Sequence, residues 1–197
     1  MNDVFTIGDF CFRLICPDDL PIPENFMKFR AGTDPEYIYR IAFSQIFPAP
    51  EGHILTRRQD MLILEKNGRE TRYIAMPGRP DYHACCAEVS DREMEILVQP
   101  GKREMMAIDT MFCSLLALER RLVERKGLIL HCAFAEYQEE AILFSAPSET
   151  GKTTQANLWE RFRGAQTVNG DRCLLQKLEG RWYARGWPVC GSSGVCR

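Results

Sequence analysis

The segment Phe144-Ser145-Ala146-Pro147-Ser148-Glu149-Thr150-Gly151-Lys152-Thr153-Thr154 decides the fold of the C-terminal part of this 197-residue chain. It ends in the Gly-Lys-[Ser/Thr] signature of a Walker A phosphate-binding loop, with Ala146 in the place of that motif's first glycine. An apolar run precedes the segment and a helical pattern follows it. This strand, loop and helix order gives the motif structural meaning; an ordinary strand-to-helix turn is the alternative interpretation.

Each residue type in the loop has a chemical reason. A polyphosphate needs several converging N–H donors, and a loop at a helix N-terminus supplies them together with the helix dipole. Gly151 lets the backbone approach closely, Lys152 reaches the β- and γ-phosphates, and the Thr153 hydroxyl binds Mg²⁺. We therefore predict a site for ATP with Mg²⁺. The residues expected to bind the nucleotide are Ala146, Pro147, Ser148, Glu149, Thr150, Gly151, Lys152, Thr153 and Thr154.

The elements around the loop follow from hydrophobic periodicity. Residues 128–134 and 141–145 have strand character, and a helix is expected from about residue 152 to 162, closed by Gly164. Apolar residues at three- and four-residue steps predict one long amphipathic helix over residues 104–125, whose apolar face serves core packing.

The first hundred residues indicate an antiparallel β region. Short apolar runs at residues 10–14, 38–43, 61–64 and 72–75 alternate with turn signals, and Asn67-Gly68 predicts a tight hairpin. We expect a mixed α/β (α+β) fold: a β-rich region over residues 1–104, then a helix and a partial P-loop unit over residues 105–197.

Composition excludes several classes of protein. With 25 Lys and Arg against 27 Asp and Glu, the net charge of −2 argues against a dedicated nucleic-acid binder. No apolar run approaches the roughly 18 residues of a membrane span, and the first residues lack the basic character of a signal peptide. A cytoplasmic protein without a membrane partner is expected. The sequence leaves open whether it forms a homo-oligomer.

The nine cysteines are odd in number and include no C-x-x-C pair, so neither a disulfide framework nor a zinc knuckle is indicated. Reduced thiols are expected, with Cys113 and Cys132 as small core residues. A metal site at His83, Cys85 and Cys86 is the lesser alternative.

Three stretches resemble HPr kinase/phosphorylase-like proteins, which share a P-loop core with phosphoenolpyruvate carboxykinase. They are Leu130-His131-Cys132-Ala133, the loop from Leu143 to Thr154, and Asn169-Gly170-Asp171-Arg172. The tail from Gly186 to Gly194 is similar to a segment of smaller relatives, some of which accompany peptide-modification cassettes. The resemblance covers roughly residues 128 to 197.

The resemblance implies ATP-dependent phosphoryl transfer to a serine hydroxyl of a protein or peptide. By that analogy Asp171 binds Mg²⁺ with Thr153 and orients the acceptor, while Lys152 and His131 complete the catalytic set. Alone, Asp171 is equally well a turn residue beside Gly170, and His131 a hydrogen-bonded core residue. Residues 191–194 are expected to form a plain turn, with backbone anion binding as the alternative.

Departures from the family pattern support a second hypothesis, a non-catalytic ATP-binding module with a regulatory or assembly role. Ala146 and Glu149 stand where the family usually has glycine, and Gly170 replaces the first of two adjacent acids. The Glu149 carboxylate would repel phosphates unless Mg²⁺ or Arg172 intervenes. The P-loop unit is also shorter than the 100 or so residues typical of such domains, so we expect it to be incomplete.

Overall fold

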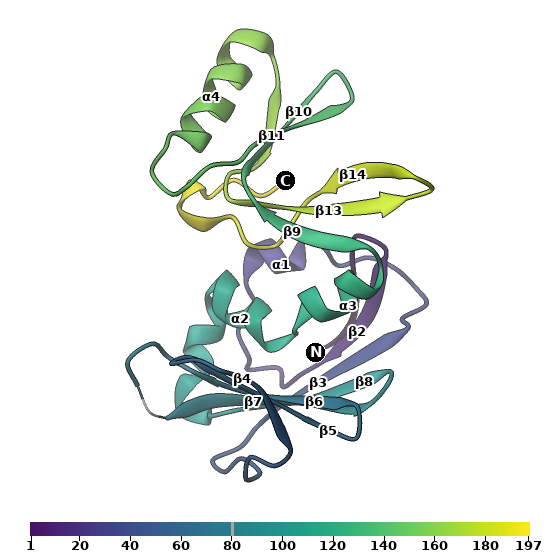
Figure 1. The fold of residues 1–197 in the computed structure, drawn as a ribbon, viewed down its shortest axis with the longest axis vertical. Coiled ribbons are helices and arrows are strands. Elements are labelled where there is room, and N and C mark those ends of the chain that lie inside the picture. The colour runs from purple at the N-terminus through teal and green to yellow at the C-terminus, as the bar shows by residue number, and fades with distance from the viewer. Residues whose placement is uncertain (80) are drawn as a thin grey trace. The chain divides into compact units, whose positions relative to one another are not determined.

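The computed structural model describes residues 1–79 and 81–197 and shows a strand-rich mixed α/β chain (Figure 1). The chain divides into two compact units. Unit 1 consists of Met1–Thr6, Cys11–Pro23 and Arg30–Leu116, and unit 2 of Ile7–Phe10, Glu24–Phe29 and Ala117–Arg197.

Unit 1 is built on an eight-stranded sheet with the order β1-β2-β3-β8-β7-β6-β5-β4. The neighbouring strands from β8 to β4 pair antiparallel, as expected, whereas the β2–β3 and β3–β8 pairs are parallel. The bounds of these strands are β1 Asn2–Ile7, β2 Phe10–Ile15, β3 Tyr37–Phe43, β4 His53–Arg57, β5 Met61–Lys66, β6 Arg69–Ala75, β7 Tyr82–Ser90 and β8 Glu93–Val98.

The hairpin predicted at Asn67-Gly68 is confirmed. It joins β5 to β6, and both turn residues have positive φ, 55° at Asn67 and 76° at Gly68. A two-residue turn of this kind matches the right-handed twist of the flanking strands, and both residue types tolerate left-handed backbone. Local chemistry therefore sets the register of this pair.

The single long helix predicted over residues 104–125 is wrong. The segment forms a 3₁₀ helix η1 (Pro100–Ala107) and two short helices, α2 (Asp109–Leu115) and α3 (Leu118–Glu124). The chain breaks at Ala117, which has a φ of 47°. All residues from 115 to 118 are buried. Four consecutive residues span most of the circumference of a straight helix, whereas an amphipathic helix buries one face, and the break at Ala117 accompanies the burial of all four.

Unit 2 contains two three-stranded sheets, with the orders β11-β10-β12 and β14-β13-β9, and every pair within them is antiparallel. The bounds are α1 Glu24–Met27, β9 Gly127–His131, β10 Ala133–Tyr137, β11 Glu140–Phe144, α4 Lys152–Arg163, β12 Gln166–Asn169, β13 Arg172–Leu178, β14 Arg181–Arg185 and the 3₁₀ turn η2 Gly191–Ser193.

The strand expected over residues 128–134 is in fact two strands that belong to different sheets. The division falls at Cys132, whose backbone N–H donates to the carbonyl of Asp171 at 2.9 Å. Periodicity cannot reveal such a change of partner, because both halves keep strand character.

Helix α4 confirms the predicted element and its end. It runs from Lys152 to Arg163, and Gly164, at a φ of 72°, donates its N–H back to the carbonyl of Trp159 in the pattern of a glycine C-cap. Trp159 packs on the β11-β10-β12 sheet through Tyr137 and Phe144, with ring centroids 5.6 Å and 6.3 Å away. The helix therefore covers one face of this small sheet (Figure 1).

Candidate functional site

Strand direction brings the predicted site residues to one end of the strands in the β11-β10-β12 sheet. Strands β11 and β12 are both antiparallel to β10, so they run in the same direction and end at the same edge. The loop over residues 145–151 follows β11, Gly170 and Asp171 follow β12, and His131 lies just before β10. The site is thus assembled by topology from three places in the sequence.

The loop after β11 is exposed and is organised by Lys152. The Nζ of Lys152 donates to the carbonyls of Ala146 and Pro147, at 3.0 Å each. Thr150 Oγ1 donates to the Pro147 carbonyl at 2.7 Å, and Gly151 caps α4 with a φ of 90°. The lysine ammonium therefore holds two carbonyl oxygens of the loop by hydrogen bonds.

Glu149 shows why glycine suits this position. Its φ is 65°, in the left-handed region that costs a residue with a Cβ about 1 kcal/mol or more and costs glycine little. Ser148 and Thr154 are exposed, as is the rest of the loop up to Thr150. The loop thus keeps a conformation typical of glycine without having one at residue 149.

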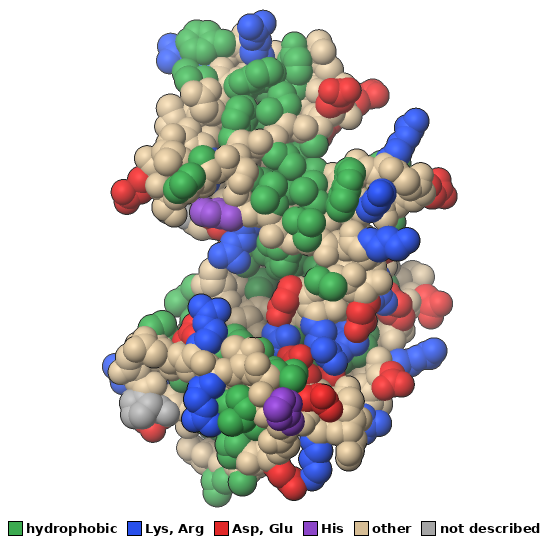
Figure 2. Space-filling view, in the orientation of Figure 1, with side chains coloured by type: hydrophobic (Ala, Val, Ile, Leu, Met, Phe, Trp, Pro, Cys, Tyr) green, Lys and Arg blue, Asp and Glu red, His purple; other side chains and the backbone are tan. Residues whose placement is uncertain are grey.

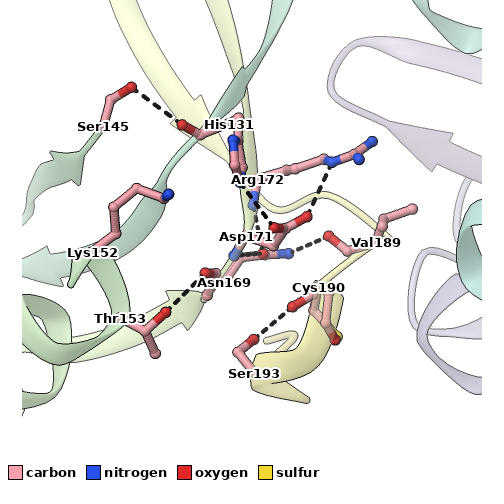
Figure 3. Close-up of polar contacts among 12 residues, drawn as sticks. His131, Ser145, Lys152, Thr153, Asn169, Asp171, Arg172, Val189, Cys190 and Ser193 are labelled. Atoms are coloured by element: carbon pink, nitrogen blue, oxygen red, sulfur yellow. Dashed lines mark hydrogen bonds and ion pairs between the residues drawn. The ribbon is translucent and has the colours of Figure 1, made fainter. Parts of the chain in front are cut away.

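Asp171 lies between two nitrogen-bearing side chains (Figure 3). Its Oδ1 is 3.2 Å from His131 Nε2 and its Oδ2 is 3.1 Å from Arg172 Nε. The carboxylate is about one quarter exposed and His131 about one half. His131 is therefore a surface residue of the site, not the core residue that the alternative interpretation assumed.

Two further contacts join α4 and the loop before it to the residues around Asp171. Thr153 Oγ1, in the first turn of α4, is 3.5 Å from the carbonyl of Gly170 (Figure 3). Ser145 Oγ donates to the carbonyl of His131 at 3.2 Å. At the far end of α4, Glu160 accepts a hydrogen bond from Thr167 of β12 at 2.7 Å, and this bond lowers the pKa of the Glu160 carboxyl. The helix is thus fixed to the β12 side of the sheet along its length.

Sequence reasoning missed the role of Asn169. This fully buried residue ends β12, and its Nδ2 donates to the carbonyls of Trp187 at 2.8 Å and Val189 at 3.1 Å. Its Oδ1 accepts the backbone N–H groups of Asp171 and Arg172, both at 2.9 Å. Asn169 therefore sets the backbone that carries Asp171. The only sequence signal was a polar residue at the end of a weakly apolar strand.

The segment after Pro188 packs over the same backbone, where residues 191–193 form the expected turn η2. Ser193 Oγ donates to the carbonyl of Cys190 at 2.6 Å. A Cβ built on Gly170 would lie 2.2 Å from both Cβ and Oγ of Ser193, far inside contact distance. In this chain a side chain at residue 170 would clash with Ser193 as that residue is placed.

A pair of thiols lies behind the site. Cys132 and Cys173 are fully buried with their Sγ atoms 3.5 Å apart, so Cys132 is a core residue, as predicted, and so is the buried Cys113. The hydrogen bond between the thiols lowers the pKa of Cys132, and the same bond with burial raises that of Cys173. No disulfide bond involves any of the nine cysteines, all of which lie among the described residues.

The metal alternative at His83, Cys85 and Cys86 finds no support. On the interior strand β7, His83 and Cys85 lie on one face and Cys86 on the opposite face, and among residues 1–79 and 81–197 no three His, Cys, Asp or Glu side chains cluster to hold a metal ion. Over the same residues, no helix has the length and apolar character needed to cross a bilayer.

Comparisons with known proteins add no identification. No model of a known protein family matches the chain, and no curated protein or solved structure matches it significantly.

Proposed function

We propose that this protein binds Mg-ATP at the loop before α4 and transfers a phosphoryl group to a serine hydroxyl of a protein or peptide. The observation that carries the proposal is the convergence of Lys152, Asp171 and His131 at one sheet edge. Phosphoryl transfer needs positioning and charge neutralisation more than covalent chemistry, and these groups supply both. Cytoplasm, where ATP and reduced thiols coexist, is the proposed setting.

The loop suits a polyphosphate. The residues from Ser148 to Thr153 surround the N-terminus of the twelve-residue helix α4, so backbone N–H groups and the helix dipole favour an anion there. Without nucleotide, the Lys152 ammonium donates its hydrogen bonds to the carbonyls of Ala146 and Pro147. An incoming phosphate would replace those carbonyls as the partner of the ammonium, at little cost in reordering the side chain.

The donor set also suits Mg²⁺. Thr153 and Asp171 would hold it, because the Thr153 hydroxyl already lies near the carbonyl of the residue before Asp171. A hydroxyl and a carboxylate are the oxygen ligands that Mg²⁺ prefers, with water completing its shell. When bound, the ion neutralises charge on the phosphates.

The remaining roles belong to Asp171 and its two neighbours. Asp171 orients the acceptor hydroxyl and accepts its hydrogen bond, while Lys152 stabilises the negative charge of the phosphoryl group in transit. His131 and Arg172 fix the carboxylate from either side, and Arg172 also offsets the repulsion that Glu149 brings to the phosphates.

One observation favours a second candidate, a nucleotide-binding regulatory or assembly module without turnover. Gly170 cannot carry an acid while Ser193 occupies the adjacent space. Asp171 would then serve without the neighbouring acid of the kinase family.

The first experiment is thermal unfolding with and without Mg-ATP for wild type, Lys152→Ala and the charge-matched control Lys177→Ala. ATP at 100 times its Kd should add about 2.7 kcal/mol, a shift of a few degrees. We expect the shift in wild type and in the control but not in Lys152→Ala. An equal shift in all three proteins, or in none, would refute the nucleotide site.

Measurement of ADP release then separates the two candidates. Steady ADP production by wild type that Asp171→Asn abolishes supports the kinase, and tight ATP binding without turnover supports the module.

A further inference from the structure

Unit 2 contains a groove that the nucleotide site does not use. Its volume is about 670 Å³, and it lies between the β10–β11 hairpin and the β13–β14 hairpin. Phe134 and Leu143 are direct partners in the first hairpin, and Leu175 and Ala184 in the second, so each pair presents its side chains on one face of its sheet. The groove therefore lies between two sheet faces.

The floor of the groove is apolar. Phe134 belongs to a buried cluster with Cys132 and Cys173, and Leu143, Leu175 and Ala184 pack against that cluster. One wall carries Trp182, whose side chain is 57% exposed and lies on the same face of β14 as Ala184. Large, rigid aromatic side chains of this kind are the usual anchors of protein–protein binding.

The rim of the groove is acidic. Among the described residues that line it, Glu136, Glu139 and Glu140 carry a carboxylate and Arg181 a guanidinium, so their formal charge is −2; the Nζ of Lys177 lies 5.9 Å from the centroid of the Trp182 ring. Figure 2 shows hydrophobic side chains over β10, β11 and β14, with acidic side chains at the tip of the β10–β11 hairpin. Such a charge favours a cationic occupant.

Both hairpins also have an edge strand whose backbone N–H and C=O groups are available to a further strand. Strands β11 and β14 are edge strands of their sheets, so one side of each has no strand partner among the described residues. An extended peptide can add to such an edge through main-chain hydrogen bonds while its alternate side chains enter an apolar groove.

From these features we propose that the groove binds an extended polypeptide segment in which apolar side chains alternate with lysine or arginine. The apolar side chains lie on Phe134, Leu143 and Leu175 beside Trp182, and the basic ones pair with the glutamates of the rim. Binding of this segment requires no nucleotide, so it is independent of the proposed phosphoryl transfer and is tested separately.

Fluorescence anisotropy with two labelled probes tests the groove without nucleotide. One probe is a nine-residue peptide that alternates lysine with leucine and phenylalanine; in the other, glutamate replaces every lysine. We expect the basic peptide to bind at least tenfold more tightly. The double variant Glu136→Lys/Glu139→Lys should reverse that preference, whereas Glu124→Lys, outside the groove, should leave it unchanged.

A second pair of variants tests the apolar wall. Trp182→Ala should weaken binding of the basic peptide about tenfold, and Phe162→Ala, an exposed aromatic on α4 outside the groove, should not. Equal binding of both peptides, or binding that survives both Trp182→Ala and the charge reversal, overturns the proposal. A dimer in sedimentation that Trp182→Ala dissociates also overturns it, because a second copy of the chain would then fill the groove. The charge reversal leaves the apolar floor intact, so it tests the proposal even if Trp182→Ala is poorly folded.

Discussion

The contact between Gly170 and Ser193 gives a quantitative test of how the site is built. An alanine at residue 170 would place its Cβ 2.2 Å from the Cβ and Oγ of Ser193 but 3.8 Å from its Cα. The Gly170 backbone is outside the positive-φ region, so alanine suits its conformation. The whole cost of Gly170→Ala therefore comes from the Ser193 side chain. Overpacking of this kind lowers the free energy of unfolding by about 1–3 kcal/mol.

Removal of the opposing side chain should rescue the variant. Ser193→Gly alone loses two hydrogen bonds. In one, Ser193 Oγ donates to the Cys190 carbonyl at 2.6 Å, and in the other the Val195 N–H donates to Ser193 Oγ at 3.2 Å. At a partly exposed site water replaces much of this, so we expect a loss of about 1 kcal/mol. The double variant should cost no more than Ser193→Gly, which corresponds to a coupling energy of about 1–3 kcal/mol.

Urea denaturation of wild type, both single variants and the double variant measures this coupling. Gly101→Ala is the matched control, because a Cβ at Gly101 meets no atom within 4 Å and its φ is not positive. We expect it to be nearly neutral and additive with Ser193→Gly. If Gly170→Ala and Ser193→Gly also add within about 0.5 kcal/mol, the proposed packing of η2 on the Asp171 backbone is refuted.

Two other buried groups yield predictions. Asn169→Ala should lower the free energy of unfolding by about 2–4 kcal/mol, because four backbone partners lose a hydrogen bond and two of these bonds are buried; a loss below about 1 kcal/mol in urea denaturation would contradict this account. Burial, and to a lesser degree Lys102, lower the pKa of His83, whose two ring nitrogens are buried without a hydrogen-bond partner among the described residues. The folded protein thus favours neutral His83, a stabilisation fully present above the unfolded pKa of about 6.5 and lost as the pH falls below it, by at most about 1.4 kcal/mol per pH unit. Unfolding at pH 7.5 and pH 5.0 should therefore show a smaller difference in His83→Leu than in wild type, and an unchanged difference would argue against a buried neutral imidazole.

The features that the sequence predicted are those set by local chemistry. The Asn67-Gly68 hairpin follows from the φ angles of two residues, and α4 follows from a periodic pattern closed by Gly164. The antiparallel expectation for the first hundred residues holds for most of that sheet, since short strands joined by tight turns pair with their neighbours in sequence. The two parallel pairs on β3 required knowledge of distant partners.

The features that the sequence did not predict depend on such distant partners. The helix over residues 104–125 breaks at Ala117 because tertiary burial of four consecutive residues outweighs helix periodicity. The strand at residues 128–134 divides because Cys132 bonds to Asp171, almost forty positions later. In the sequence Asn169 is only a polar residue at the end of a weakly apolar strand, whereas in the fold its amide joins two stretches of backbone.

The position of Asp171 shows how these distant partners act together. The space that a side chain at residue 170 would fill holds Ser193 instead. The same C-terminal segment accepts the Asn169 amide through Trp187 and Val189, and Asn169 in turn holds the backbone of Asp171. The glycine at residue 170 and the packed C-terminal segment are therefore one structural feature. Any acid introduced at residue 170 requires removal of the Ser193 side chain first, and in the Ser193→Gly background Gly170→Asp would place a second carboxylate beside Asp171.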